Sequence, residues 1–242
     1  MIALITGVSR EMGLGFSVAR LLAEKGFQVI ITARDLQKAS ALADKLQADK
    51  RDVHALALDI TDQDSIEQVA AYIAKKHGRL DVLINNAVAG LNFVQKTEEV
   101  DIAEVRLAFE TNVIGPWQTT ETLLPLLRKS KQARIVNVSS EASSFAAEGG
   151  LHGPYTLGVL SAYSVSKAGL NAFTVKLAQS LQDEGILVNA IDPGFTATHP
   201  EMVDQYGARS PQESAEGIVW AATLPQDGPT GGFFRDGEPL PW

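Results

Sequence analysis

Short apolar runs alternate with amphipathic stretches along the whole chain. Short uninterrupted runs are typical of strands buried on both faces, whereas apolar residues repeating every three to four positions are typical of helices. The expected strands are residues 2–6, 28–32, 54–58, 82–85, 135–138, 187–191 and 232–234. The expected helices are residues 16–25, 35–50, 65–77, 102–129, 163–182 and 210–224. This alternation predicts a doubly wound α/β fold, in which a parallel sheet lies between two layers of helices.

Composition narrows the class of protein further. The 242 residues suit one domain spanning 1–242, and the 45% hydrophobic content is enough for a sizeable core. The net charge of −8 disfavours nucleic acids and anionic membranes as partners. The chain has no cysteine, and its four histidines show no ligand spacing, so we expect no metal. Because the first strand begins next to Met1 and no apolar run approaches about 20 residues, we expect a cytoplasmic protein.

A glycine-rich turn follows the first strand. Gly7 ends the strand, and Gly13-Leu14-Gly15 opens the first helix. Glycines allow a tight turn and a close backbone approach, and the free N–H groups at a helix start favour an anion such as pyrophosphate. Such turns also occur without a ligand. This one opens the first half of a βαβ unit, which favours a dinucleotide site.

Tyr163 and Lys167 lie four positions apart in the expected helix 163–182, so a phenol and an ammonium share one helix face. A cation held nearby stabilises a phenolate and lowers the pKa of the phenol from about 10. Proton transfer to a carbonyl oxygen then becomes feasible. Pairs of this kind also occur by chance on half-exposed helix faces, so the interpretation depends on the surrounding motifs.

The glycine turn, the Tyr163/Lys167 pair and several runs between them resemble the short-chain dehydrogenase/reductase family over nearly the whole chain. The similar segments are the adenine-contacting Asp59-Ile60-Thr61-Asp62, the strand end Asn85-Asn86-Ala87, the helix asparagine Asn112, the serine-bearing strand 135–140 and the nicotinamide turn Pro193-Gly194. Residues 32–35 and the ending 231–242 resemble the NADPH-dependent carbonyl reductase branch more than the fatty-acid-synthesis branch.

This resemblance implies a set of catalytic roles. NADPH would deliver hydride to a carbonyl carbon while Tyr163 protonates the oxygen, Ser140 steadies that oxygen, and Lys167 holds the ribose and tunes the tyrosine. Ser140 matches the family position, whereas Ser139 would point to the opposite face of the strand. Either serine could instead cap a turn. Asn112 would link Lys167 to solvent through water, and the alternative is a buried amide that ties helix to strand.

Charge at the end of the second strand indicates which cofactor is bound. An NAD-binding protein usually places a carboxylate there, but this chain has Arg34. A guanidinium can clamp a 2′-phosphate, and Arg10 could approach the same phosphate from the other side, so we predict NADPH. Alternatively, Arg34 is solvated and Asp35 caps a helix. The predicted cofactor-binding residues are Gly7, Ser9, Arg10, Gly13, Leu14, Gly15, Arg34, Asp59, Ile60, Asn86, Ala87, Tyr163, Lys167, Pro193, Gly194, Thr196 and Thr198, with Thr198 preferred to Thr196 by family spacing.

Two features depart from the family pattern. Five residues, 8–12, separate Gly7 from Gly13 where the family usually has three, so the loop must bulge, and Glu11 brings a carboxylate near the expected anion. Val88 stands where the family motif usually continues with glycine, and its bulk could narrow the cleft. Neither departure removes a catalytic group.

Residues 141–162 and 195–208 are the expected substrate loops, because long loops on a rigid scaffold often carry function. The apolar and aromatic residues of the first loop favour a small hydrophobic ketone or aldehyde as substrate. The alternatives are a 3-oxoacyl thioester or enone reductase of the same family, and a non-enzymatic dinucleotide-sensing protein. The sequence leaves a homodimer, a homotetramer and a monomer open. The residues of the first loop that could form a cleft wall or lid are Phe145, Leu151, His152, Tyr155 and Leu157.

Overall fold

A computed structural model describes residues 1–154, 156–199 and 207–242. Its strands are β1 Ile2–Ile5, β2 Gln28–Ala33, β3 Val53–Ala57, β4 Val82–Asn85, β5 Arg134–Val138, β6 Leu187–Ile191, β7 Phe233–Arg235 and β8 Glu238–Pro239. Within the described residues they form one eight-stranded sheet in the order β3-β2-β1-β4-β5-β6-β7-β8. Neighbours pair in parallel from β3 to β7, and β8 joins β7 antiparallel.

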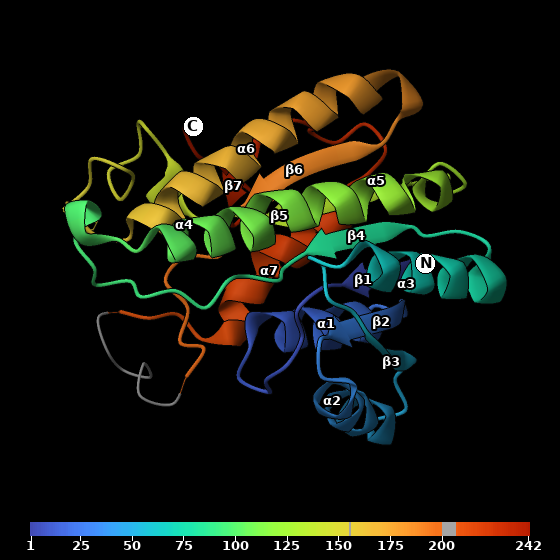
Figure 1. The fold of residues 1–242 in the computed structure, drawn as a ribbon. Coiled ribbons are helices and arrows are strands. Elements are labelled where there is room, and N and C mark those ends of the chain that lie inside the picture. The colour runs from blue at the N-terminus through green and yellow to red at the C-terminus, as the bar shows by residue number, and fades with distance from the viewer. Residues whose placement is uncertain (155, 200–206) are drawn as a thin grey trace.

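Helices cover both faces of this sheet (Figure 1). They are α1 Leu14–Glu24, α2 Leu36–Ala48, α3 Gln63–His77, α4 Ile102–Phe109, α5 Gly115–Leu127, α6 Ser161–Leu181 and α7 Pro211–Ala222. Side chains of α1, α2 and α7 pack in one core, and side chains of α3, α5 and α6 pack in the other. The doubly wound α/β fold predicted from the sequence is therefore confirmed.

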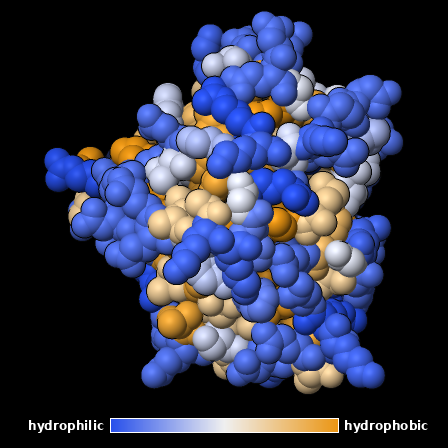
Figure 2. Space-filling view, turned by 90° about the vertical axis from the view of Figure 1, so that its right-hand side faces the viewer, coloured by the Kyte–Doolittle hydropathy of each residue, from blue (hydrophilic) through white to orange (hydrophobic). Residues whose placement is uncertain are grey.

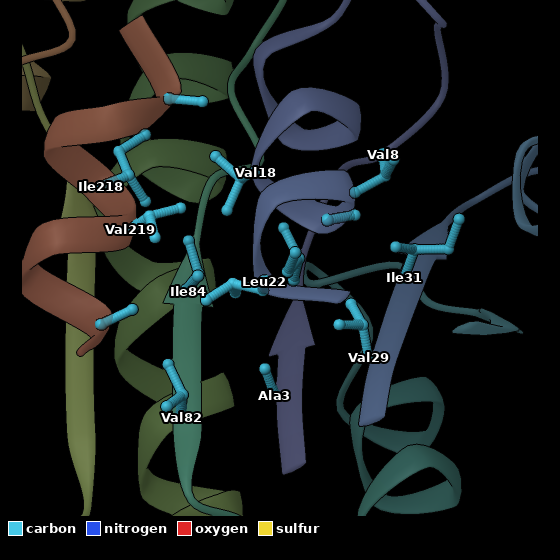
Figure 3. Packing of buried hydrophobic residues seen from close by; sticks show 14 of the residues in the cluster. Ala3, Val8, Val18, Leu22, Val29, Ile31, Val82, Ile84, Ile218 and Val219 are labelled. Atoms are coloured by element: carbon cyan, nitrogen blue, oxygen red, sulfur yellow. The ribbon is translucent and has the colours of Figure 1, made fainter. Parts of the chain in front are cut away.

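The alternation of side chains along each strand supplies both cores. In β1, Ala3 and Ile5 belong to the core under α1 and α7, whereas Ile2 and Leu4 belong to the opposite one. Figure 3 shows the first core, in which residues of α1 and α7 lie over the strands. The labelled residues are Ala3, Val8, Val18, Leu22, Val29, Ile31, Val82, Ile84, Ile218 and Val219.

The expected helix 102–129 is interrupted. A π-helical turn, Glu110–Ile114, separates α4 from α5. The local sequence explains the break, because Pro116 has no N–H to donate to the carbonyl of Asn112 and its ring would clash with that carbonyl in a regular α-helix. Such π-turns often occur at functional sites. The antiparallel strand β8 was also not anticipated, because the sheet was expected to be parallel.

The parallel strands place their carboxyl ends at one edge of the sheet, at the left of Figure 1. The sheet order reverses between β1 and β4, and ligands of such folds bind in the crevice at this point. Figure 2 shows the other side of the molecule, where hydrophilic residues predominate and hydrophobic ones are scattered. Among the described residues, no helix combines the length and apolar character needed to span a bilayer.

Candidate active site

The glycine turn packs closely against the segment that follows β4. Gly7 has a φ of +74°, and a Cβ on it would lie 2.6 Å from the Cα of Ala87. A Cβ on Gly15 would lie 2.7 Å from Nδ2 of Asn86. The Oγ1 of Thr6 accepts hydrogen bonds from the N–H groups of Asn86 (3.0 Å) and Ala87 (3.1 Å). Any larger residue at either glycine would therefore push the two segments apart.

The amino-terminal turn of α1 has the properties of an anion site. Gly13 is its N-cap, and no side chain in the described part of the chain caps the helix. The N–H of Phe16 already bonds to the carbonyl of Gly13 at 3.1 Å, and among the described bonds of this turn the N–H groups of Leu14 and Gly15 remain for an anion. The helix dipole adds positive potential there. Ser9 lies exposed in the preceding loop. These features suit the pyrophosphate of a dinucleotide.

The glycine turn, with five residues between Gly7 and Gly13, is closed by a local hydrogen bond. The N–H of Gly13 bonds to the carbonyl of Arg10 at 3.1 Å, which closes the turn. Glu11 pairs with Lys45 of α2, so its carboxylate is directed toward that helix. The Arg10 guanidinium contacts the ring of His199, in the loop after β6. A role for Arg10 at a 2′-phosphate stays a prediction.

The expected adenine end lies at the carboxyl ends of β2 and β3. Arg34 is exposed directly after β2. Asp35 caps α2, where its Oδ1 accepts two backbone N–H groups at 3.0 and 3.3 Å, so the capping alternative holds for Asp35. The Oδ1 of Asp59 accepts from the backbone N–H (3.0 Å) and hydroxyl (2.7 Å) of Thr61, and Ile60 beside it is buried. These contacts give the segment a fixed shape.

The two serines after β5 have different surroundings. Ser139 is buried, and its hydroxyl donates to Oδ1 of Asn171 at 2.5 Å. The Oγ of Ser140 accepts from the N–H of Ala142 at 3.3 Å, and Ser140 acts to lower the pKa of the Tyr163 phenol against the larger effect of burial. Ser140 therefore acts on the predicted proton donor, whereas the hydroxyl of Ser139 is bonded to Asn171.

Tyr163 and Lys167 share one face of α6, as their spacing indicates. The Nζ of Lys167 lies 5.8 Å from the centre of the Tyr163 ring. The same Nζ donates to the carbonyl of Val138, at the end of β5, over 2.7 Å. Lys167 is only 3% exposed, so its ammonium is held in place beside the tyrosine and the strand end.

The electrostatics of this pair differ from the prediction. Burial raises the pKa of Tyr163 to about 12, with a smaller opposing effect of Ser140 and a further rise from the charge of Asp192. Burial also lowers the pKa of Lys167 to about 8. The pKa of the phenol therefore shifts in the direction opposite to the predicted one, because desolvation of the phenolate dominates over stabilisation by a nearby cation. The phenol is protonated at neutral pH, which is the form that donates a proton.

Asn112 lies in the π-helical turn and is fully buried. Its Oδ1 accepts from the N–H of Ala89 at 3.0 Å, and its Nδ2 donates to Oγ of Ser166 at 2.9 Å. These bonds join the helix pair α4–α5 to the segment after β4 and to α6. The contacts are those of a buried amide that ties elements together, and a water link to Lys167 stays a prediction.

The turn at Pro193 and Gly194 follows β6. The hydroxyl of Thr196 donates to the carbonyl of Gly194 at 3.0 Å and contacts Oγ of Ser214 at 2.8 Å, so its bonds are internal. Thr198 is partly buried and contacts Nδ1 of His199 at 3.2 Å. The structure thus separates the two threonines by their surroundings, and a cofactor contact of either one stays a prediction.

The sequence matches the family model described as short chain dehydrogenase over residues 1–208. The chain belongs to the short-chain dehydrogenase family. Carbonyl reductase [NADPH] 1 of Mus musculus is 32% identical over 279 aligned positions, which cover 100% of this chain and 98% of the mouse protein. The 3-oxoacyl-[acyl-carrier-protein] reductase of Vibrio cholerae is 32% identical over 198 positions, covering 81% of this chain and 74% of that protein.

Two solved structures have the same fold as this short-chain dehydrogenase over almost its whole length. NADPH-bound carbonyl reductase from chicken fatty liver has a TM-score of 0.85 and 26% identity, covering 99% of this chain and 98% of its own. A metagenomic short-chain oxidoreductase in complex with NADP has a TM-score of 0.78 and 28% identity, covering 97% and 96% respectively. The chain is therefore similar to oxidoreductases along its length.

Several residues around the site of this short-chain dehydrogenase were not predicted from the sequence. Phe93 contacts the ring of Tyr163, and Asp192 forms a buried ion pair with Arg235. An aspartate directly after the buried run 187–191 was a visible signal for Asp192, because a charge at the end of an apolar strand needs a partner. No comparable signal marks Phe93 or Arg235.

Large apolar side chains are exposed in the segments after β4, β5 and β6. They are Val88, Phe93, Val94, Phe145, Leu157 and Phe195. Val88 is 50% exposed, so its bulk lies at the surface of the site, and whether it narrows the cleft stays a prediction. Tyr155 and part of the expected loop 195–208, residues 200–206, lie outside the described residues. In the part of the chain that the structure describes, no three His, Asp or Glu side chains gather to hold a metal ion.

Proposed function

We propose that the protein is an NADPH-dependent oxidoreductase that reduces a ketone or aldehyde carbonyl to an alcohol. One observation carries this proposal. The ring of Tyr163 lies beside the buried ammonium of Lys167, 5.8 Å from its Nζ, and the same Nζ donates to the carbonyl of Val138, two residues before Ser140 at the carboxyl edge of the sheet. Two hydroxyl groups next to a cation suit a substrate carbonyl oxygen, because they stabilise the negative charge that this oxygen gains during reduction.

The residues around the crevice fit a dinucleotide. Gly7 and Gly15 leave no room for a Cβ, and the amino-terminal turn of α1 presents N–H groups to an anion. Arg34 supplies a guanidinium for a 2′-phosphate at the end of β2. The chicken carbonyl reductase structure is NADPH-bound and the metagenomic oxidoreductase structure is a complex with NADP, which supports the same cofactor here. When bound, NADPH supplies the hydride.

The side chains of the chain supply orientation and the proton. Tyr163 donates its phenolic proton to the carbonyl oxygen, and its pKa of about 12 keeps that proton in place at neutral pH until the oxygen gains charge. Ser140 donates a hydrogen bond to the same oxygen and orients it. Lys167 holds positive charge beside the phenolate that remains.

The substrate is expected to be hydrophobic. Phe93, Leu157 and Phe195 expose apolar surface in the segments that follow β4, β5 and β6. Apolar walls with a few polar groups are typical of small-molecule sites. We therefore infer that residues 141–162 and 195–208 act as substrate loops and that a small hydrophobic carbonyl compound binds between them.

The experiment that tests this function is NADPH oxidation, followed optically with a panel of aromatic and aliphatic ketones and aldehydes. NADH serves as the cofactor control. We expect turnover with NADPH, and we expect Tyr163→Phe to abolish turnover while NADPH still binds, because the phenyl ring lacks the donated proton. Normal turnover in Tyr163→Phe, or no turnover by the wild type despite tight NADPH binding, would contradict the proposal.

The same panel separates a second candidate function. Relatives named 3-oxoacyl-[acyl-carrier-protein] reductase and (-)-isopiperitenone reductase, the latter from Mentha piperita at 31% identity, suggest a thioester or an enone as substrate. An acetoacetyl thioester and a cyclic enone therefore belong in the panel. Binding of NADPH with no turnover of any compound would favour a dinucleotide sensor.

We further propose a homodimer formed through the outer faces of α5 and α6. Ile114 at the end of the π-helical turn, Trp117 of α5 and Val165 of α6 are 42%, 53% and 50% exposed, which is unusual for large apolar side chains in a group. These helices resemble the usual dimer surface of the family. Sedimentation velocity tests the assembly directly, and a single species of monomer mass at micromolar concentration would contradict it.

A further inference from the structure

A buried carboxylate joins two turns of the site. Asp192 follows β6 directly and is 3% exposed. Its Oδ1 accepts the backbone N–H of Glu141, in the turn after β5, at 3.0 Å. Its Oδ2 accepts the backbone N–H of Gly194, in the turn after β6, at 3.1 Å. One side chain thus holds the main chain of both turns.

Arg235 of β7 neutralises this carboxylate. Its Nε donates to Oδ2 of Asp192 at 2.5 Å, and a terminal nitrogen donates to Oε2 of Glu141 at 2.5 Å. The position of the guanidinium is set by the sheet, because the N–H of Asp192 bonds to the carbonyl of Phe234 at 2.9 Å. A buried carboxylate needs such a partner, since an unpaired charge in the interior is strongly destabilising.

The two turns held by Asp192 carry groups of the proposed reaction. Ser140 is the residue immediately before Glu141, so the bond to the Glu141 N–H fixes the backbone that carries the Ser140 hydroxyl. Gly194 has a φ of +72° and lies in the turn that resembles the nicotinamide-contacting turn of the family. Small displacements of reacting groups cost large factors in rate, so a brace between the turns has a catalytic consequence.

We propose that Asp192, with Arg235 as its counter-ion, is a positioning residue that holds the Ser140 turn and the Pro193–Gly194 turn in fixed relation. The rate consequence of this inference rests on the proposed function, in which Ser140 orients the substrate oxygen. The bracing itself rests on the hydrogen bonds of Asp192 alone.

The charge of Asp192 also acts on the proton donor. The charged groups around the Tyr163 phenol are Lys167 on the same helix, Asp192 after β6, and the partners of Asp192, namely Glu141 and Arg235. These three linked side chains carry one net negative charge when ionised, and Asp192 raises the pKa of Tyr163. The brace therefore favours the protonated phenol, which is the form needed for reduction.

Amide exchange tests the brace without using activity. Native-state hydrogen exchange measured by NMR compares wild type with Asp192→Asn, whose amide cannot keep the charge or all three bonds. We expect the amides of Glu141 and Gly194 to exchange at least about tenfold faster in the variant, because their bonds to the carboxylate are lost or weakened. Arg128→Met is the matched control, since it removes the Arg128–Glu184 pair, which lies outside this network.

A double-mutant cycle tests the catalytic consequence. Arg235→Met leaves a buried carboxylate unpaired, so its Tm should fall more than that of Asp192→Asn/Arg235→Met, which removes both charges. The double variant should recover Tm relative to Arg235→Met but keep kcat at least about tenfold below wild type, because the brace is still missing. If Asp192 only stabilised the fold, the double variant would recover both Tm and kcat.

The outcomes separate the inference from the proposed function. Carbonyl turnover by wild type with kcat of Asp192→Asn within about twofold of it would overturn the inference and leave the function intact. If wild type turns over no carbonyl compound, the proposed function fails, and the exchange rates still decide the brace: faster exchange at Glu141 and Gly194 supports it, and unchanged exchange overturns it.

Discussion

The ring of Phe93 packs edge-on against the ring of Tyr163, with 5.4 Å between the ring centres and 89° between their planes. The carbonyl of Phe93 also accepts the N–H of Leu160, one residue before α6, at 3.3 Å. The segment after β4 is thereby held against the amino-terminal end of α6. Phe93 thus forms a wall beside the proposed proton donor.

Replacing Phe93 with alanine should change substrate preference. Loss of the ring opens space beside Tyr163, so we expect kcat/KM for bulky ketones to rise relative to small ones by about tenfold, the effect of one or two methylene-sized contacts in an apolar pocket. Kinetics on a ketone series of increasing size measure this ratio. Val94→Ala is the matched control, because Val94 is 81% exposed and should leave the ratio unchanged. An equal fall for every ketone in Phe93→Ala would show that the ring only supports Tyr163.

Substitution of Ser140 should reduce kcat, whereas substitution of Ser139 should reduce stability. Ser140→Ala removes a donor to the substrate oxygen, and we expect kcat to fall by about a hundredfold with little change in Tm. Ser139→Ala leaves Oδ1 of Asn171 without its hydroxyl donor, so the free energy of unfolding should fall by about 1–3 kcal/mol while kcat stays close to wild type. Thermal unfolding and steady-state kinetics on both variants decide the assignment. The opposite pattern would make Ser139 the reacting serine.

Substitution of Arg34 should change the preference for NADPH over NADH, whereas substitution of Asp35 should change only the stability of the protein. Arg34→Ala removes the proposed partner of the 2′-phosphate, so the KM for NADPH should rise by about ten- to a hundredfold while the KM for NADH changes little. Asp35→Ala removes the cap of α2 and should cost about 1 kcal/mol of stability with no change in the NADPH to NADH ratio. Equal effects of Arg34→Ala on both cofactors would end the assignment.

The lowered pKa of Lys167 sets an upper pH limit for reduction. Burial places this pKa at about 8, so the side chain is an ammonium below that pH and neutral above it. With Lys167 as the required cation, kcat/KM should fall as pH rises through about 8, and Tyr163, with a pKa of about 12, should not contribute in this range. A profile of kcat/KM from pH 6 to 10 measures this fall in activity. Residual activity of Lys167→Arg should lack it, because a guanidinium keeps its charge. A flat wild-type profile would refute the role.

The regular part of this fold was predictable because short apolar runs and amphipathic stretches report burial directly. The strands at residues 28–33, 82–85 and 187–191, for example, lie within a residue of the predicted ranges. The interruption at residues 110–114 was also encoded, because Pro116 excludes a regular α-helix, but the apolar pattern runs through it and hid it. A pattern of hydrophobicity says nothing about which backbone bonds a proline removes.

The candidate site was predictable in its motifs and not in its electrostatics. The spacing of Tyr163 and Lys167 gave their shared face, but the pKa of the phenol depends on burial by segments distant in sequence. The ion pair between Asp192, directly after β6, and Arg235 of β7 forms because these two strands are neighbours in the sheet, which the sequence alone does not show. Contacts of this kind require the fold before they can be inferred.

The strand that carries Arg235 is made later than the residues it serves. Ser140, Tyr163 and Asp192 all precede β7 in the chain, and β6 pairs with β7 at Ala190 and Phe233. During translation, Asp192 therefore has no counter-ion until Arg235 has been synthesised and β7 has joined the sheet. A chain ending before residue 235 would therefore contain Ser140, Tyr163 and Lys167 but not the counter-ion of Asp192.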